Sequence, residues 1–472
     1  MGIGALDYKK GGSGLNINGI IEDYYVYAGE NVNAGDFVEF IEGIAGKKDF
    51  GTSVDTKIPL GATDSQAAYA PVFAVELEAN KIFIAHRNYA GGISGVIATI
   101  QNGHEISVGT STVLCSNEYS GNSFTGELLS NGDIFIAHRY GSNYHLYGFI
   151  VTIEGETITA GTDTSILTST STGEYISTAL LPNGNVFIAH SYGSSYYVYG
   201  IVCVINGTTF TAGTKTPIVS NKNSGTAISA TTIANNRVFV SYKYGAQYNA
   251  AVVCGIDWTT ISIGSEKSLG NLYGAYTNST TLSENKVLVA YCSPSSELIK
   301  ARICTISNMT ITNGTAVDLV TLGHLHNPIP LLTISEDAVL FLHNIDANER
   351  YLYGMICTID ETTITVGTDV QLNTSKYSGY YAHPVLLSDG NIFIAHSLNR
   401  SFYLYAQIWG IDETNNILTD EISAIEYETQ VRPATALPCK GVAKSSGEGG
   451  DETAHNEQVS IYVPELGVTK WE

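Results

Sequence analysis

Histidine recurs at a fixed place in this sequence, at the end of a short apolar segment that reads GNVFIAH over residues 184–190. Imidazole is the commonest metal ligand in proteins, and it titrates near neutral pH. A ring of such side chains would therefore bind metal ions or sense pH. Seven residues hold the position, two of them tyrosines: His86, His138, His190, Tyr242, Tyr291, His343 and His396.

A structural role for this position is the second interpretation. Each side chain would end a strand and hydrogen-bond to the backbone of its own or the neighbouring repeat. Tyrosine at Tyr242 and Tyr291 favours this interpretation, since a phenol can replace such a hydrogen bond but not an ordinary zinc ligand. Seven copies of a catalytic residue would also be unnecessary. The two interpretations differ in whether each imidazole has a protein partner without metal.

The cysteines are predicted to be buried apolar side chains. Four of the seven occupy one repeat position, two residues before an isoleucine: Cys203, Cys254, Cys304 and Cys357. Equivalent positions of adjacent repeats lie too far apart for a disulfide. The sequence has no CxxC pair and no Cys/His group with zinc spacing, and the acidic stretch 448–457 lacks the spacing of an EF-hand. We therefore predict no metal site and no cofactor.

Tyrosines follow the histidine position and could bind sugars, because an aromatic ring with a polar tip stacks on a sugar face. The alternative is that these rings pack between neighbouring sheets. The expected turns carry two tyrosines four residues apart in three successive repeats. The candidate contacts for a glycan or receptor are Tyr140, Tyr144, Tyr192, Tyr196, Tyr244 and Tyr248.

Enzymatic activity is not expected. Hydrolysis needs a pair of carboxylates or a nucleophile with its base, and no such pattern stands out. Propeller sialidases carry an arginine cluster and repeated Asp-box turns. This chain has only seven arginines and no recurring Asp-box.

The elements that position these residues form seven repeats. The copies of the apolar segment end at 86, 138, 190, 242, 291, 343 and 396, and a period of about 50 residues indicates a propeller or array. The third repeat predicts strands over 175–181, 186–191 and 196–205, with a fourth from Thr208 that bends at Gly213–Thr214. We predict an all-β chain whose residues 61–424 form a seven-bladed β-propeller.

Residues 1–60 and 425–472 lie outside the repeats and are predicted to form one small, discontinuous β-barrel-like module. A closed propeller has adjacent ends, so it is readily inserted into another domain. The seventh repeat lacks the Gly-Thr pair in its last strand, and Gly51–Leu60 faintly resembles the missing piece. Either this segment completes the last blade as a clasp, or the seven repeats close the ring alone.

The net charge of −22 argues against nucleic-acid and anionic-membrane partners. No apolar run reaches the 18 or so residues that span a bilayer, so no membrane insertion is expected. The first residues lack the apolar core of a secretory signal. The expectation is synthesis in a bacterial host's cytoplasm.

The two chain ends resemble halves of a module of tailed-phage head-decoration or head-fibre proteins, on GENVNAGDFVEF (29–40) and GVAKSSGEGGDETAHNEQVSIYVP (441–464). The loop 445–456 is longer and more acidic than in that family. The resemblance implies a structural protein at the virion surface that docks on phage capsid or tail proteins. The implied anchoring residues are Gly35, Asp36, Phe37, Val38, Gly441, Val442, Ala443, Val459, Ile461 and Val463.

Two functions remain open. The first is a capsid decoration or head-fibre protein that displays its propeller, with weak attachment to a host-cell surface glycan as an additional role. The second is a receptor-binding or glycan-binding tail fibre or tail-tip protein, a propeller lectin. The oligomeric state is not predicted.

Overall fold

The computed structural model describes the backbone from 19 to 464 and side chains from 71 to 420, each with gaps. The backbone gaps are 27–30, 33–36, 53–55, 59–70, 89, 102–104, 170, 194–195, 221–226, 235, 245–247, 272–275, 294–297, 322–328, 346–350, 374–377, 399–402, 413–416, 434–440, 444–446 and 449–457. The chain divides into two compact units. One comprises Met1–Asp49 with Ser423–Glu472, and the other Phe50–Ile422.

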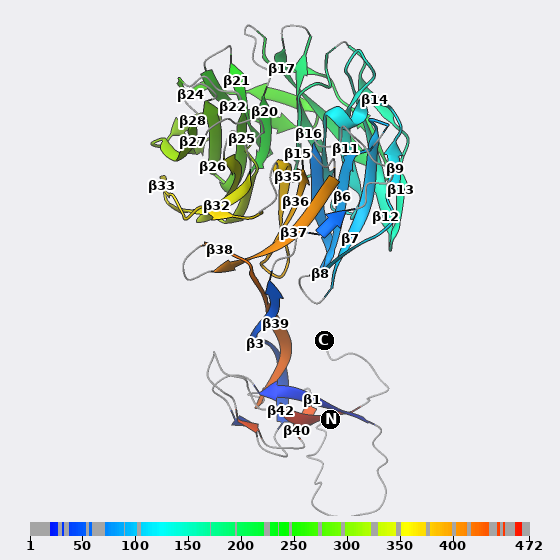
Figure 1. The fold of residues 1–472 in the computed structure, drawn as a ribbon, viewed down its shortest axis with the longest axis vertical. Coiled ribbons are helices and arrows are strands. Elements are labelled where there is room, and N and C mark those ends of the chain that lie inside the picture. Colours follow the sequence, from blue (N-terminus) through cyan, green and yellow to red (C-terminus); the bar gives the residue numbers. More distant parts are fainter. Residues whose placement is uncertain are drawn as a thin grey trace, which may run out of the picture. The chain divides into compact units, whose positions relative to one another are not determined.

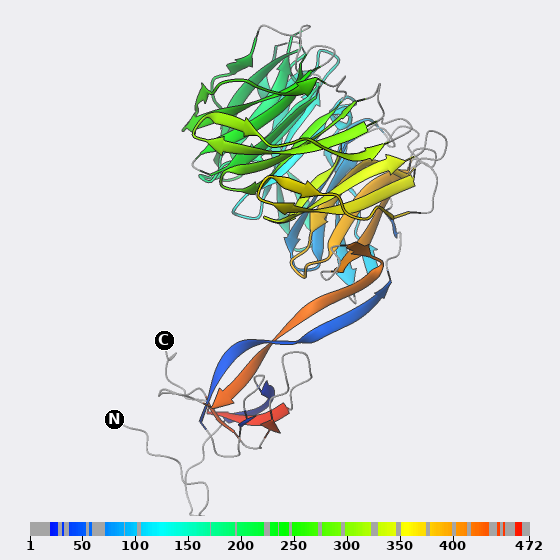
Figure 2. The ribbon, with the colours of Figure 1, turned by 90° about the vertical axis from the view of Figure 1, so that its left-hand side faces the viewer.

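The larger unit contains seven antiparallel sheets, one for each repeat (Figures 1 and 2). The first four are β5 to β9 (Val72–Glu78, Lys81–Arg87, Ile93–Gln101, Glu105–Val108, Thr112–Cys115), β10 to β14 (Phe124–Leu128, Ile134–Tyr140, His145–Glu154, Thr157–Ala160, Thr164–Leu167), β15 to β19 (Ile176–Leu180, Val186–Tyr192, Tyr197–Asn206, Thr209–Ala212, Thr216–Val219) and β20 to β24 (Ile228–Ile233, Arg237–Tyr244, Tyr248–Asp257, Thr260–Ile263, Lys267–Asn271).

The remaining three complete the set. They are β25 to β29 (Thr277–Ser283, Lys286–Ser293, Leu298–Ser307, Thr310–Asn313, Val317–Thr321), β30 to β34 (Leu331–Ser335, Ala338–Ile345, Tyr351–Asp360, Thr363–Thr365, Val370–Gln371) and β35 to β38 (Ser378–Leu386, Ile392–Leu398, Tyr403–Asp412, Ile417–Thr419), joined by β4 (Thr56–Ile58). We call these sheets blades 1 to 7 in chain order.

The blades close into a ring. The first strand of each blade contacts the first strand of the next, and β35 of blade 7 contacts β5 of blade 1. Seven apolar clusters fill the seven interfaces between neighbouring blades, and the one that joins blades 7 and 1 includes Phe393 and Ile84. Ser388 of blade 7 also hydrogen-bonds Glu76 of blade 1 through its amide, at 2.8 Å, and its hydroxyl, at 3.0 Å. The prediction of an all-β, seven-bladed propeller is confirmed.

The GNVFIAH segment is the second strand of blade 3 because both of its faces must be buried. Val186 through His190 are fully buried in β16, between blades 2 and 4. Phe187 fits against strand β17 because Gly200 has no side chain: a Cβ there would lie 3.0 Å from the Phe187 ring. Continuous burial explains why the segment shows no polar alternation.

The Gly-Thr pair bends the fourth strand, as predicted. In blade 3, β18 and β19 both pair with β17, and residues 213–215 separate them. The Gly213 amide donates to the Val202 carbonyl at 2.8 Å, and a Cβ on Gly213 would lie 2.9 Å from that oxygen. Glycine is therefore required where the chain steps from one half-strand to the other.

Residues 56–58 supply the half-strand that blade 7 lacks. Strand β4 pairs antiparallel with β37, with Ile58 opposite Leu404, Lys57 opposite Tyr405 and Thr56 opposite Ala406. In blade 3 the same place is taken by β19 of the blade's own repeat. The clasp interpretation of Gly51–Leu60 is therefore confirmed for these three residues, and they belong to the propeller unit rather than to the terminal one.

The smaller unit is a closed barrel of β1 (Gly19–Val26), β39 (Glu421–Pro433), β3 (Phe37–Thr52), β40 (Gly441–Ala443) and β42 (Gln458–Pro464), with β2 (Asn31–Val32) paired to β41 (Gly447–Glu448). Most of the implied anchoring residues lie on these strands. Phe37 and Val38 pair with Val442 and Gly441, Ala443 pairs with Ile461, and Val459 and Val463 pair with β1. Gly35 and Asp36 lie outside the described residues.

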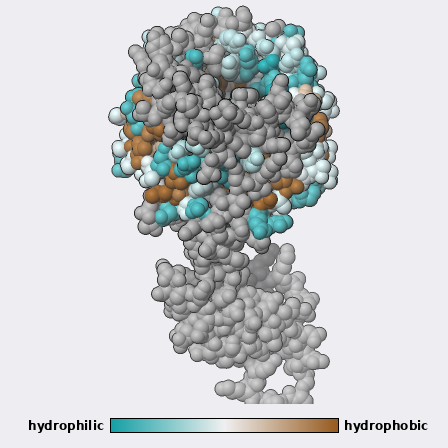
Figure 3. Space-filling model, viewed as in Figure 1, coloured by the Kyte–Doolittle hydropathy of each residue, from teal (hydrophilic) through white to brown (hydrophobic). Residues whose placement is uncertain are grey.

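Among the described residues the one helical element is a short 3-10 turn, η2 (Ser120–Asn122), and no helix there is long and apolar enough to cross a membrane. On the face that Figure 3 shows, the described surface of the propeller mixes hydrophilic and hydrophobic residues. Cys203, Cys254, Cys304 and Cys357 are fully buried and free, as predicted.

Candidate functional site

The side chains that end the second strands are buried, and the backbone holds the histidines of blades 1 to 3. The Nδ1 of His86, His138 and His190 lies 3.0, 2.8 and 2.7 Å from the carbonyl oxygen of the following residue. A carbonyl only accepts, so Nδ1 carries the proton in each. These are the contacts that the structural interpretation predicts. Burial lowers the pKa of His86 and His190 to about 4, with a further repulsion from Lys215 on His190.

A variable polar residue faces the strand end from the bend in the fourth strand. It stands two positions after the bend glycine and is aspartate in blades 2 and 6, lysine in blade 3 and glutamate in blade 4, whereas blades 1 and 5 have Ser111 and Ala316. His138 Nε2 lies 2.9 Å from Asp163 Oδ1 in blade 2, and the Tyr242 hydroxyl donates to Glu266 Oε2 at 2.8 Å in blade 4. Blade 3 has Lys215 at this place. The same place in blades 2, 3 and 4 therefore carries side chains of different charge.

A stacked pair of tyrosines lies next to His138, the partner of Asp163, in blade 2. The rings of Tyr140 and Tyr147 are parallel within 19° and 4.2 Å apart. Tyr147 pairs directly with His138, and Tyr140 follows His138 by two residues, so strand alternation puts all three on one face. Both tyrosines are half-buried, which leaves part of each ring open to a ligand.

The same pair recurs 52 residues later in blade 3. The rings of Tyr192 and Tyr199 lie 4.6 Å apart, and Lys215 Nζ lies 3.7 Å from the centre of the Tyr192 ring and 5.7 Å from that of Tyr199. A hydrogen bond from the Lys215 ammonium is the main cause that lowers the pKa of Tyr192. We call these two groups the blade 2 and blade 3 tyrosine pairs.

The second tyrosine of each predicted turn lies elsewhere. Tyr144 has a φ of 58° in the hairpin turn, and its ring stacks on the Arg139 guanidinium at 3.6 Å, with Tyr119 5.5 Å from the same group. Arg139 alternates to the strand face opposite Tyr140. Tyr140 and Tyr144 therefore contribute to different surfaces, although the sequence places them four residues apart.

The later predicted tyrosines also separate. Tyr196 has a φ of 48° and meets Tyr175 edge-on at 6.0 Å. Tyr248 is 37% exposed and pairs through its backbone with Tyr244, whose side chain lies outside the described residues. Neither belongs to the tyrosine pair of blade 3.

The structure adds partners that sequence reasoning did not select, namely Tyr147, Tyr199, Asp163 and Lys215. Their signal was present in the sequence. Tyr147 and Asp163 follow Tyr140 by 7 and 23 residues along the sequence. Tyr199 and Lys215 follow Tyr192 by the same numbers of residues. The same repeat therefore identifies both candidate sites once the hairpin register is known.

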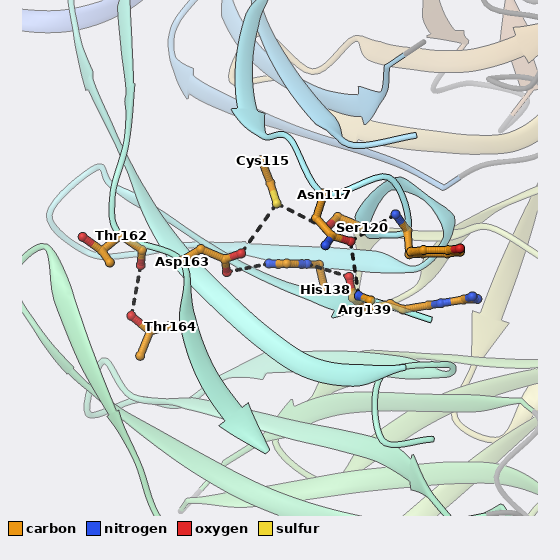
Figure 4. A network of polar contacts seen from close by, with 10 residues as sticks. Cys115, Asn117, Ser120, His138, Arg139, Thr162, Asp163 and Thr164 are labelled. Atoms are coloured by element: carbon orange, nitrogen blue, oxygen red, sulfur yellow. Dashed lines mark hydrogen bonds and ion pairs between the residues drawn. The ribbon is translucent and has the colours of Figure 1, made fainter. Parts of the chain in front are cut away.

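One cysteine joins this network, which the spacing in sequence did not predict (Figure 4). Cys115 Sγ lies 3.6 Å from Asp163 Oδ2 and 3.2 Å from Ser120 Oγ. The thiol thus contacts the carboxylate, and His138 binds the other carboxylate oxygen. Burial is the main cause that raises the pKa of Cys115, so this is not the arrangement of a thiol activated by a neighbouring base.

No protein-family model matches this chain, and no curated protein matches its sequence. Some solved structures are similar to part of this chain. A lectin of Aleuria aurantia in complex with Fucα1-6GlcNAc is 14% identical, with a TM-score of 0.42, over 65% of this chain and 97% of the lectin. An ulvan lyase, a polysaccharide lyase, is 8% identical, with a TM-score of 0.47, over 80% and 97%.

AofleA of Arthrobotrys oligospora is 9% identical, with a TM-score of 0.45, over 70% of this chain and 91% of its own. The Aleuria aurantia lectin is described as six-bladed, whereas this chain has seven blades. At such identities and TM-scores the likeness concerns the fold alone and carries no argument about function.

Proposed function

We propose that this chain is a non-enzymatic glycan-binding protein whose propeller binds sugars at the tyrosine pairs of blades 2 and 3. One observation carries the proposal: a half-buried pair of tyrosine rings beside a charged side chain occurs twice at the same repeat spacing. Aromatic faces bind the apolar face of a sugar ring, and the charged group binds its polar substituents. Repetition allows multivalent binding of weak ligands.

The two pairs should prefer different sugars. Asp163 beside the blade 2 pair is an acceptor, which suits neutral sugars that donate hydroxyl hydrogens. Lys215 beside the blade 3 pair is a cation within 3.7 Å of the Tyr192 ring centre, which suits a carboxylated or sulfated sugar. Binding to acidic glycans should therefore weaken with salt, while binding to neutral glycans should not.

Removal of a paired ring should abolish most of the binding. We expect Tyr192→Ala to weaken binding to acidic glycans by about 30-fold, because a tyrosine at a binding hot spot contributes about 2 kcal/mol. A glycan array with the full-length protein identifies the ligand, and calorimetry measures the loss. Tyr353→Ala is the matched control. Tyr353 of blade 6 is equivalent to Tyr199, but Ile345 stands where blade 3 has Tyr192, so blade 6 has no tyrosine pair at this place. Equal losses in both variants, or no glycan bound at millimolar sensitivity, would contradict the proposal.

The resemblance of the chain ends to phage decoration proteins supports a second part of the proposal, in which the barrel of the terminal unit docks on a phage capsid and the protein resides at the virion surface. The location of both chain ends in one unit is consistent with a single docking module. A tail fibre or tail tip is the alternative location. The ligand on a host-cell surface would then be recognised by the propeller.

Attachment to a particle should depend on the terminal unit. We expect deletion of residues 425–472 to remove the protein from purified particles, because β39, β40 and β42 form most of the barrel. Quantitative immunoblotting of gradient-purified particles measures this loss. The Tyr192→Ala variant should stay attached, which separates docking from glycan binding. A truncated chain that remains on the particle would refute the docking role.

A further inference from the structure

Cys115, His138 and Asp163 bring a thiol, an imidazole and a carboxylate to one point between blades 1 and 2. Their ligand atoms all lie within 4.8 Å of one another, and in the described part of the chain no other such group of metal-ligating side chains occurs. Cys115 ends β9 of blade 1, His138 lies near the end of β11, and Asp163 stands in the bend between β13 and β14 of blade 2. Three segments far apart in sequence thus converge (Figure 4).

The hydrogen bonds around His138 leave room for either a proton or a metal ion at its second nitrogen. Nδ1 donates to the Arg139 carbonyl at 2.8 Å, so in the neutral ring Nε2 carries only a lone pair. That lone pair faces Asp163 Oδ1 at 2.9 Å, and a carboxylate is an acceptor as well. Two acceptors at this distance must share a proton or a metal ion. A metal-ligating histidine commonly donates its other ring N–H to a backbone carbonyl, as His138 does.

We propose that Cys115, His138 and Asp163 bind a divalent transition-metal ion of the zinc class that ties blade 1 to blade 2. One sulfur, one nitrogen and one oxygen are the donors that zinc accepts in four-coordinate sites. Cys115 and His138 are buried, whereas the Asp163 side chain is 27% exposed. Water reaches the site from the aspartate side and completes the coordination. Metal binding replaces the thiol proton and the proton between His138 and Asp163, both of which leave to solvent.

Blade 6 contains the same imidazole–carboxylate pair without the thiol, although His343 Nδ1 has no hydrogen-bond partner there, unlike His138 Nδ1. His343 Nε2 lies 2.8 Å from Asp369 Oδ1, as in blade 2. Val320 is equivalent to Cys115. It precedes His343 by 23 residues, as Cys115 precedes His138. It also pairs with Ile299 beside a bulge, as Cys115 pairs with Ile93. The chain therefore offers an internal control in which the imidazole and carboxylate are present and the sulfur is absent.

Titration with Co²⁺ tests the proposal, because a cobalt–thiolate bond gives a charge-transfer band that imidazole and carboxylate do not produce. The full-length protein, purified without an affinity tag and stripped of metal, should bind one equivalent with this band, and Zn²⁺ should displace it. Cys115→Ser should abolish the band. Asp163→Asn should weaken binding by more than about 100-fold, since loss of an outer partner of a ligand alone costs 10–100-fold. Asp369→Asn should leave both the affinity for Co²⁺ and the thiolate band unchanged.

A gain of binding provides the second test. Val320→Cys should create a second equivalent of Co²⁺ with a second thiolate band, because it completes the blade 6 set. Cys439 lies outside the described residues, so Cys439→Ser serves as a control for an unrelated thiolate. The proposal is overturned if the folded wild-type protein shows no thiolate band, if the band survives Cys115→Ser, or if Val320→Cys adds no second equivalent.

Discussion

Phe187→Ala should lower the free energy of unfolding by about 3–5 kcal/mol, the usual loss when a buried phenylalanine is truncated to alanine. The ring is completely buried in β16 and belongs to the cluster that fills the interface between blades 3 and 4. It packs against Gly200, where the side chains of Ile218 and Ile261 also come close. The surrounding strands are held by ladders on both sides, so they cannot collapse into the cavity.

Phe187→Leu is the matched control, because the propeller itself uses leucine here. Leu288 and Leu340 hold the equivalent place in blades 5 and 6, and both are fully buried. We expect this variant to lose only about 1 kcal/mol, because leucine keeps most of the buried apolar volume. Urea unfolding followed by circular dichroism measures the free energy of unfolding of both variants. Similar losses in the two variants would show that the cavity is not the dominant cost.

The repeat period predicted most of the propeller because each copy packs against its neighbours in the same way. A strand buried on both faces needs apolar residues at every position, and Val186 to Ala189 show this directly. The bend glycine was also visible, because a Cβ on Gly213 would approach the Val202 carbonyl. This backbone constraint occurs in six of the seven repeats, and glycine occurs with it each time.

The tyrosine site was only half predicted because proximity along the chain was used in place of strand geometry. Tyr140 and Tyr144 are four residues apart, yet the turn sends Tyr144 to the Arg139 face. Tyr147 meets Tyr140 because the hairpin register pairs it with His138. Alternation and register, which the turn fixes, decide which rings meet.

The meeting of Cys115 with His138 and Asp163 was beyond the reach of sequence spacing. It depends on how the fifth strand of blade 1 packs on the second and fourth strands of blade 2. The equivalent residue of blade 5 is Val320, so no recurring pattern draws attention to the cysteine. Contacts between neighbouring repeats are set by packing, and a single substitution in one repeat can create a site there.

The clasp shows how the ring deals with an incomplete last repeat. In blade 3, Pro217 stands opposite Tyr199, and proline has no N–H to donate. Tyr405 and Lys57 are the equivalent pair in blade 7. The Lys57 amide therefore points away from β37, and alternation along an antiparallel pair turns the amide of Ile58 toward the Leu404 carbonyl.

Ile58→Pro should therefore lower the free energy of unfolding by about 1–3 kcal/mol, the cost of losing a ladder hydrogen bond and leaving a carbonyl without its partner. Lys57→Pro should stay within about 0.5 kcal/mol of the wild type, since it removes no ladder bond. Ile58→Ala keeps the backbone N–H and shortens the side chain, so it measures the contribution of the side chain alone. Urea unfolding compares the three, and hydrogen exchange at Leu404–Ala406 should accelerate only in Ile58→Pro. If both proline variants were equally stable, the N-terminal segment would not hold blade 7 through its backbone, and ring closure would rest on the direct contacts between blades 7 and 1.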